Sequence, residues 1–208
     1  MSISSELLTL NTTKQNIKTA INLKGVTVND EPFADYPDKI RLIPSGGGNY
    51  ESNIILYIEG ELRNAEIPSG TTKIGYSAFY GFYTTLENVT IPNTVTEIEE
   101  YAFEGCRKLN NVTLPSGLTT IWNRAFEECI SFTSVVLPAS VTDIHHEAFK
   151  NCTGLTSITV NAVSPPTIGN QVFDNTNNCP IYVPANSVLA YQTASGWQTY
   201  ASRITAIP

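Results

Sequence analysis

The sequence lacks the features that mark a membrane protein, a secreted precursor or a nucleic-acid-binding protein. In 208 residues no apolar run approaches the roughly 18 residues that cross a bilayer, so we expect no membrane insertion. The N-terminal stretch MSISSELLTLNTTKQ has neither a basic start nor a continuous apolar segment, so we find no secretory signal and expect folding in a cytoplasm. A net charge of −7 argues against nucleic acid as a partner, because phosphate contacts need clustered Lys and Arg.

Histidines are scarce, and the motifs of common enzymes are missing. His145 and His146 are the only histidines, and adjacent strand residues point to opposite faces, so they are badly placed to bind one ion together. Asp143 and Glu147 nearby leave a weak metal site conceivable beside the plainer surface role. The chain contains no Gly-x-Ser-x-Gly motif and no phosphate-binding loop. We therefore predict no enzyme, no metal and no cofactor.

What the sequence does contain is one short phrase repeated at a fixed interval. YAFEGC at 101–106 returns as RAFEEC at 124–129 and as EAFKNC at 147–152. A period of this length with regular Leu, Ile and Val is in the range of leucine-rich repeat coils. The phenylalanines of this phrase and of its weaker copies are 24, 23, 23 and 24 residues apart: Phe79, Phe103, Phe126, Phe149 and Phe173.

Equivalent residues of successive repeats are expected to stack into one core. Alternation in NVTIP and TEI is the strand period, and proline ends the first strand of each coil. A single coil cannot bury its apolar face, whereas stacked coils form a continuous core. The predicted core ladder contains the five phenylalanines and three cysteines that are 23 residues apart: Cys106, Cys129 and Cys152.

The cysteine spacing favours a structural role over a metal site. Zinc sites need closely spaced ligand pairs, whereas Cys is often a small buried hydrophobe. We interpret the three cysteines as a reduced core ladder. The only plausible disulfide would join Cys152 to Cys179, which lies near the C-terminal end of the repeats.

The consensus L..V.IP..VT.I...AF..C..L resembles the BspA-type leucine-rich repeat of bacterial surface adhesins, some eukaryotic parasites, and phage or mobile-element proteins. The resemblance covers residues from about 53 to 208. It implies a solenoid of about five coils, mainly β with short turns. The tail CPIYVPANSVLAYQTASGWQTYASRITAI resembles that family's C-terminal cap, which implies a cap from about residue 179. There we expect Ser187 to cap a short helix, Gly196 to form a turn, and Trp197 to fold back over the last coil.

The residues before the repeats differ from them in composition. NTTKQNIKTAINLKG predicts a short amphipathic helix, and ADYPDKIRLI is a second, shorter helical candidate that Pro44 ends. The Gly-rich PSGGGNY then reads as a flexible joint, after which NIILYIEG at 53–60 begins the first sheet. We therefore predict a small α-helical anchor or oligomerisation segment at 1–43, a linker at 44–52 and the leucine-rich repeat solenoid at 53–208.

The phrase LKGVTVNDEPFADYPDKI resembles an N-terminal segment of phage tail-fibre and other virion appendage proteins. In those proteins the segment serves as an anchor and is often oligomeric. The resemblance implies contacts with other virion proteins through residues 1–48, a homo-oligomer, and a location in the virion. It does not distinguish the head of the virion from its tail. The anchor or oligomer contacts that we expect are Ile17, Ile21, Phe33 and Tyr36.

The remaining candidate site is a surface of the coils. The position after the second-strand isoleucine and a neighbouring position carry exposed aromatic and charged residues, which protein and glycan recognition uses. The alternative is that Trp122 merely packs on a neighbouring coil. The candidate ligand-binding residues are Glu99, Tyr101, Trp122, Arg124 and His145, and a second candidate face is the polar strand column Thr90, Thr113, Val136 and Thr159.

These observations favour a non-enzymatic phage fibre or decoration protein that adheres to a host surface protein or glycan. The alternative is a bacterial cell-surface adhesin of the BspA type whose export signal is absent from this sequence. A third class, a carbohydrate-active enzyme, would use acidic pairs such as Glu99–Glu100 or Glu127–Glu128. Exposed coil positions are often charged, which explains these pairs without catalysis.

Overall fold

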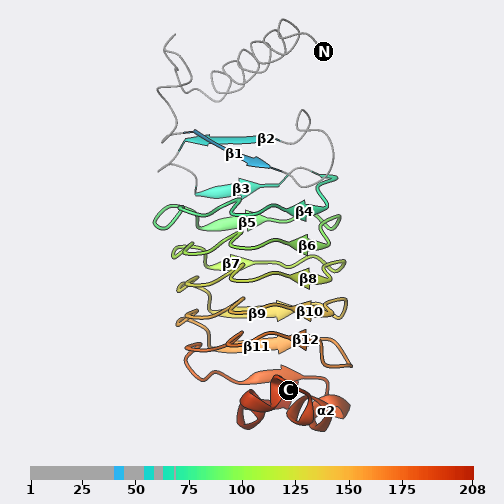
Figure 1. The fold of residues 1–208 in the computed structure, drawn as a ribbon. Helices are drawn as coiled ribbons and strands as arrows, with labels where there is room; N and C mark the ends of the chain where they lie inside the picture. Colours follow the sequence, from blue (N-terminus) through green and yellow to red (C-terminus); the bar gives the residue numbers. More distant parts are fainter. Residues whose placement is uncertain (1–39, 45–53, 59–62, 68) are drawn as a thin grey trace, which may run out of the picture.

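The computed structural model describes residues 40–44, 54–58, 63–67 and 69–208. The predicted N-terminal helix and the predicted anchor contacts Ile17, Ile21, Phe33 and Tyr36 lie outside these residues. Nearly all of the repeat region lies inside them, and it forms an elongated stack of coils (Figure 1).

One face of the stack is a sheet of five parallel strands, each only two residues long. Neighbouring strands are in register, so that the second residue of each strand, an isoleucine, pairs with the isoleucine of the next coil. Each of these strands supplies one inward and one outward side chain. In spatial order the strands are β12 (Thr167–Ile168), β10 (Asp143–Ile144), β8 (Thr120–Ile121), β6 (Glu97–Ile98) and β4 (Lys73–Ile74).

The other face carries two parallel sheets that follow one another along the stack (Figure 1). In β9 and β11, exposed or half-buried residues alternate with buried ones, as the period of two in the sequence predicts. The first sheet contains β3 (Asn64–Glu66), β5 (Asn88–Thr90) and β7 (Asn111–Val112), and the second contains β9 (Ser134–Leu137), β11 (Ser157–Val160), β13 (Ile181–Val183) and β14 (Ile204–Ala206).

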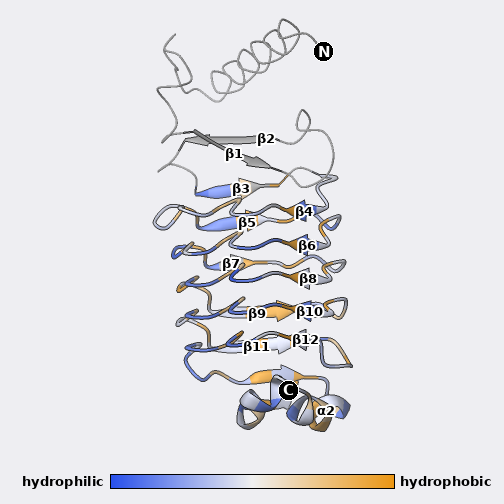
Figure 2. Ribbon diagram, viewed as in Figure 1, coloured by the Kyte–Doolittle hydropathy of each residue, from blue (hydrophilic) through white to orange (hydrophobic). Residues whose placement is uncertain are grey.

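A proline turn joins the two strands of a coil, and a corner follows the second strand. After β5, β7 and β9 the carbonyls of Pro92, Pro115 and Pro138 accept a hydrogen bond from the residue three positions later. The corner follows the second strand and needs a left-handed residue in every coil, with φ between 53° and 59°. These left-handed residues are Ser77, Tyr101, Arg124, Glu147 and Gln171. Figure 2 shows similar hydropathy recurring at matching places from coil to coil.

The core contains a column of stacked phenylalanine rings. Phe79 and Phe103 lie 4.8 Å apart between ring centroids, with 9° between their planes. The next pairs lie 5.1, 5.2 and 5.8 Å apart, and all five rings are fully buried. The backbone supports this stacking, because Phe103 N–H donates to Ala125 O and Phe126 N–H to Ala148 O, each at 2.8 Å. The stacking follows from the coil spacing of about 4.8 Å between paired strands.

The cysteines form a second buried column. Each thiol donates to the carbonyl of a phenylalanine in the preceding coil: Cys106 to Phe79 at 3.3 Å, Cys129 to Phe103 at 3.3 Å and Cys152 to Phe126 at 3.1 Å. All four cysteines, Cys179 included, are free and buried, so Cys152 and Cys179 form no disulfide. Burial raises the pKa of the three column thiols well above its usual range, which keeps them neutral and unreactive.

The C-terminal cap closes the phenylalanine column. It contains the short helices η2 (Ala185–Ser187), α2 (Val188–Thr193) and η3 (Trp197–Arg203) and ends with β14. Gly196 turns the chain with a φ of 80°, after which the buried Trp197 ring lies 5.8 Å from that of Phe173. Ser187 occupies the N-cap position of α2, but its side chain makes no capping hydrogen bond.

The buried polar groups of the cap have partners. Trp197 Nε1–H donates to Pro166 O at 2.8 Å, and the Tyr191 hydroxyl donates to Ala162 O at 2.7 Å. Arg203 donates to Cys179 O at 2.9 Å and to Thr176 Oγ1 at 2.8 Å. Because buried polar groups without partners are destabilising, this network fixes the cap in one position on the last coil.

The short helix predicted over residues 34–43 is wrong for its last residues. Ile40–Pro44 forms the strand β1, which pairs antiparallel with β2 (Ile54–Ile58). The isoleucine-rich sequences IRLIP and IILYI favour a ladder, and Pro44 stands at the end of its strand, where proline is tolerated. The predicted strand at 53–60 is present, but it belongs to this two-stranded sheet, and the solenoid sheets begin with β3.

Candidate binding surface at the corners of the coils

The corner after each second strand presents three consecutive residues, and equivalent residues of successive coils lie beside one another. We call residues 75–77, 99–101, 122–124, 145–147 and 169–171 the corner surface. All five candidate residues from the sequence lie on it: Glu99, Tyr101, Trp122, Arg124 and His145 are each half-buried. The second candidate face, Thr90 to Thr159, lies along β5 to β11 on the other side of the coils.

The first column of the corner surface contains a ring stack. Trp122 lies on His145 of the next coil, with 4.3 Å between centroids and 16° between planes. Trp122 Nε1–H donates to Glu97 Oε2 at 3.2 Å, and Glu97 also pairs with Lys73 at 2.9 Å. Trp122 therefore packs on a neighbouring coil, while part of its surface still faces solvent. Whether it also contacts a ligand stays a prediction.

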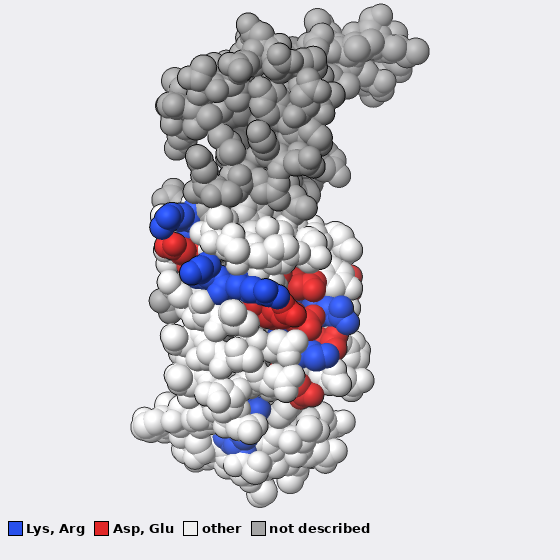
Figure 3. All heavy atoms as spheres, turned by 90° about the vertical axis from the view of Figure 1, so that its left-hand side faces the viewer, with Lys and Arg blue, Asp and Glu red and all other residues white. Residues whose placement is uncertain are grey.

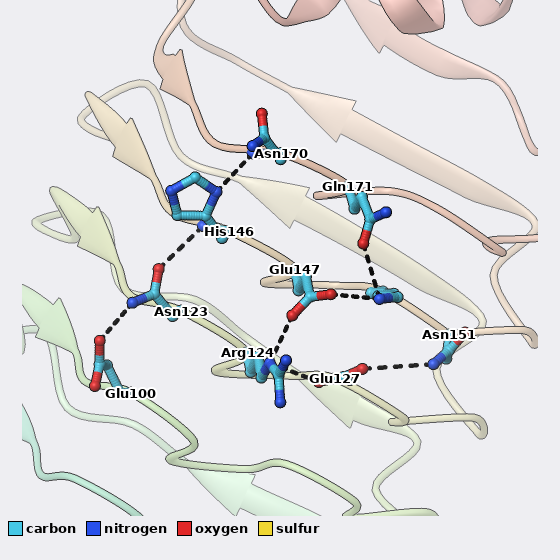
Figure 4. Close-up of polar contacts among 10 residues, drawn as sticks. Glu100, Asn123, Arg124, Glu127, His146, Glu147, Asn151, Asn170 and Gln171 are labelled. Atoms are coloured by element: carbon cyan, nitrogen blue, oxygen red, sulfur yellow. Dashed lines mark hydrogen bonds and ion pairs between the residues drawn. The ribbon is translucent and has the colours of Figure 1, made fainter.

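The second column is a chain of hydrogen bonds between side chains and the backbone (Figure 4). Asn123 Nδ2–H donates to Glu100, and Asn123 Oδ1 accepts the His146 N–H at 3.2 Å. His146 Nδ1 in turn accepts the Asn170 N–H at 2.9 Å, so this nitrogen carries no proton. Each coil thereby fixes the backbone of the next corner.

The third column combines aromatic and charged side chains. The Tyr101 ring lies 5.5 Å from that of Tyr76 in an edge-to-face contact, and the Arg124 guanidinium lies 6.0 Å from the Tyr101 centroid. Arg124 Nε–H donates to Glu147 Oε2 at 2.6 Å, and Lys150 also binds this carboxylate (Figure 4). Hydrogen bonds from Lys150 and Arg124 lower the pKa of Glu147.

A buried carboxylate lies beside this column. Glu127 is only 8% exposed, and its Oε2 lies 3.4 Å from Arg124 Nε without forming a hydrogen bond. Loss of hydration raises the pKa of Glu127. The pKa of Glu104, in the preceding coil, is raised for the same reason and by the nearby Glu127 charge.

Charged side chains on this side of the molecule gather over the middle coils, and the C-terminal end carries few of them (Figure 3). Most of the cations are paired with carboxylates. The pairs include Arg63–Glu87 at 3.3 Å, Arg107–Glu128 at 2.6 Å and Lys73–Glu97 at 2.9 Å. The surface is therefore charged in both signs but locally balanced.

Metal binding has no support in the described residues. Among them, no three His, Cys, Asp or Glu side chains are arranged to hold a metal ion. Nor does any helix of this part of the chain combine the length and apolar character needed to span a membrane. The chemistry that the corner surface does provide is that of binding, through rings, amides and paired charges.

Three exposed tyrosines were not among the residues predicted from the sequence. Tyr76, Tyr80 and Tyr83 are 60%, 38% and 39% exposed, and they follow β4 in the first well-described coil. A signal was present in YSAFYGFY, because these tyrosines occupy repeat positions at which the next coil has Glu100, Glu104 and Arg107. Aromatic residues at positions where the repeat otherwise carries charge mark a local departure from the scaffold.

Comparisons with known proteins agree with this architecture. No curated protein matches the chain. Among solved structures it is similar to the Treponema pallidum leucine-rich repeat protein TpLRR, with 28% identity, a TM-score of 0.57, and 77% of this chain and 72% of that chain covered. It is also similar to the pneumococcal vaccine antigen PcpA (15% identity, TM-score 0.53, 70% and 40% covered).

A leucine-rich cell surface protein of Faecalibacterium prausnitzii is similar at 22% identity and a TM-score of 0.42, with 77% of this chain and 56% of that chain covered. The family model described as the BspA type leucine rich repeat region matches residues 53–180 in six copies. This match, together with the stacked coils and their phenylalanine column, shows that the chain belongs to the BspA-type leucine-rich repeat family.

Proposed function

We propose that this chain is a non-enzymatic recognition protein of a bacterial cell surface, which adheres to a host protein or glycan through the corner surface. The observation that carries the proposal is the arrangement of Trp122, His145, Tyr101 and Arg124 on consecutive coils of one rigid face. Aromatic side chains and arginine provide most of the binding energy in protein interfaces.

The rigidity of the corner surface supports this function. The chain of hydrogen bonds from Glu100 through Asn123 and His146 to Asn170 fixes the backbone under the rings. The ion pair of Arg124 with Glu147 fixes the guanidinium. A binding surface that is ordered before its ligand arrives loses less conformational entropy on binding.

The virion function has less support. It rests on a resemblance carried by residues 23–40, of which all but Ile40 lie outside the described residues, and the matched family region covers only residues 53–180. The anchor at 1–43, its contacts with virion proteins and a homo-oligomer therefore stay predictions. The surface adhesin that was the alternative in the sequence analysis is the function that we put forward.

The test uses the full chain, labelled and applied to an array of host glycans and extracellular-matrix proteins. We expect a defined set of ligands, and at least a tenfold weaker binding of these ligands by Trp122→Ala and by Arg124→Ala. The control is Leu189→Ala, which removes a 73% exposed side chain from the cap. Ligand binding that both corner variants retain in full would refute the proposed surface, and an array without any ligand would refute the proposed function.

A further inference from the structure

The exposed aromatic side chains of the described residues are concentrated in one coil. Among the large hydrophobic side chains that are strongly exposed there, the aromatic ones are Tyr76, Tyr80 and Tyr83. They fall within eight consecutive residues. The other strongly exposed large side chains in this part of the chain are aliphatic and scattered from Ile130 to Ile207. We call the three tyrosines the tyrosine cluster.

Specific contacts position each ring of the cluster. Tyr76 N–H donates to Glu99 Oε2 at 2.9 Å, and its ring meets Tyr101 edge to face. The Tyr80 and Tyr83 rings lie 5.8 Å apart at 78°. The Tyr83 ring also lies over Gly105 of the next coil so closely that a Cβ on Gly105 would collide with it.

The turn that carries Tyr80 and Tyr83 differs from the turns of the later coils. Phe82 stands where those coils have Cys106, Cys129 and Cys152, and it is buried against Phe79 with 6.4 Å between centroids. The turn also has one residue more than its equivalent between Cys106 and Leu109. The larger buried side chain and the longer turn distinguish this turn, with its tyrosines, from the turns of the later coils.

Most of the charges near this cluster are paired. In the next coils Arg107 is bound to Glu128 at 2.6 Å and Arg124 to Glu147 at 2.6 Å, whereas the exposed Lys108 has no carboxylate partner among the described residues. On the neighbouring strand Lys73 is bound to Glu97 at 2.9 Å. Paired cations attract an anion less than free ones, so of these nearby cations only Lys108 favours an anionic ligand, and the aromatic rings fit a largely uncharged molecule better.

We propose that the tyrosine cluster binds a neutral oligosaccharide. A sugar ring presents C–H groups on its faces and hydroxyl groups at its edge, and tyrosines present an aromatic face beside a hydroxyl that donates and accepts hydrogen bonds. The exposed Thr84, which directly follows Tyr83, adds a further hydroxyl group. This inference rests on the proposed recognition function and names a ligand class for the coil at one end of the corner surface.

The test measures binding of the full chain to neutral glycans on a printed array, followed by calorimetry with the best neutral hexasaccharide. We expect Tyr76→Ala and Tyr83→Ala each to lower the affinity at least tenfold, and Tyr83→Phe to lower it less. The matched control is Tyr182→Ala, which removes a half-buried tyrosine from β13 near the cap and leaves affinity unchanged. Thermal unfolding verifies that each variant folds, and Tyr80→Ala replaces any variant that does not.

The outcomes separate this inference from the proposed function. Absence of any neutral glycan ligand, stronger binding of sulfated glycans, or alanine variants that bind as well as the wild type would each overturn the neutral-oligosaccharide site. In those cases a ligand that depends on Trp122 and Arg124 would still support adhesion through the rest of the corner surface.

Discussion

At the scale of single residues, the charged network shows how the environment decides what a carboxylate contributes. Glu147 receives hydrogen bonds from Lys150 and Arg124, and its pKa is lowered, whereas Glu127 is buried with one oxygen unbonded, and its pKa is raised. Glu147 therefore adds stability above its ordinary pKa of 4.5 that is lost as the pH falls through its lowered value. Glu127 has the opposite effect, because its stabilising protonated form is lost as the pH rises above 4.5.

We predict that Glu127→Gln stabilises the protein at pH 7 by about 1 kcal/mol, since an amide is less costly to bury than an incompletely bonded carboxylate. The difference from the wild type should shrink as the pH approaches 4, where Glu127 is protonated. Urea unfolding at both pH values measures it. Glu128→Gln, at a half-buried surface ion pair, is the control with little expected change. A destabilised Glu127→Gln at pH 7 would contradict this interpretation.

At the scale of elements, the coils are held by columns rather than by long strands. Strands of two residues provide few ladder hydrogen bonds, so the coils depend also on backbone hydrogen bonds at the corners, such as Tyr101 N–H to Asn123 O, and on the stacked phenylalanines and the cysteine column. We predict that Phe126→Ala lowers the free energy of unfolding by about 3–5 kcal/mol, because it leaves a cavity between Phe103 and Phe149.

The measurement is urea unfolding followed by circular dichroism. Phe126→Leu is the matched variant, and because it fills most of the volume it should lose much less stability than Phe126→Ala. Equal losses for the two substitutions, or no loss for either, would mean that the ring is not packed between its neighbours.

The period of the sequence was enough to predict these elements. Residues 23 or 24 apart that share a type must share an environment, so inside and outside positions followed from alignment of the repeats.

The β1–β2 pair could not be found this way, because neither strand is repeated and a short apolar run such as IRLIP fits a helix or a strand equally well. Alignment of the repeats does not predict the tyrosine cluster either, because its tyrosines are deviations from the repeat. The Trp122–His145 ring stack could not be predicted from the sequence, because the repeat spacing predicts which positions are neighbours but not which rotamers their side chains adopt.

At the scale of the whole molecule, the cap determines whether the stack ends or continues. A solenoid that exposes its last coil offers an apolar end and strand edges to other copies. Trp197 covers Phe173, and Tyr191 packs against Trp197 with 4.9 Å between centroids. The chain that follows adds β14 as the last strand of its sheet.

We predict that Trp197→Ala destabilises the protein by about 3–5 kcal/mol and promotes self-association, because the end of the core becomes exposed. Light scattering after size-exclusion chromatography measures the mass of the particles. Gln198→Ala, at an exposed neighbour in the same helix, should leave the mass unchanged. A Trp197→Ala protein that is as stable as the wild type and has the same particle mass would show that the cap does not close the stack.

The most direct test of the account is to block each face of the solenoid separately and to measure the dissociation constant for the best array ligand. His146→Arg places a bulky charged side chain in the centre of the corner surface, and Val136→Arg does the same on the opposite strand face, where Val136 is 51% exposed. Recognition through the corner surface predicts at least a tenfold rise in the dissociation constant for His146→Arg and no change for Val136→Arg. The reverse pattern would contradict the account.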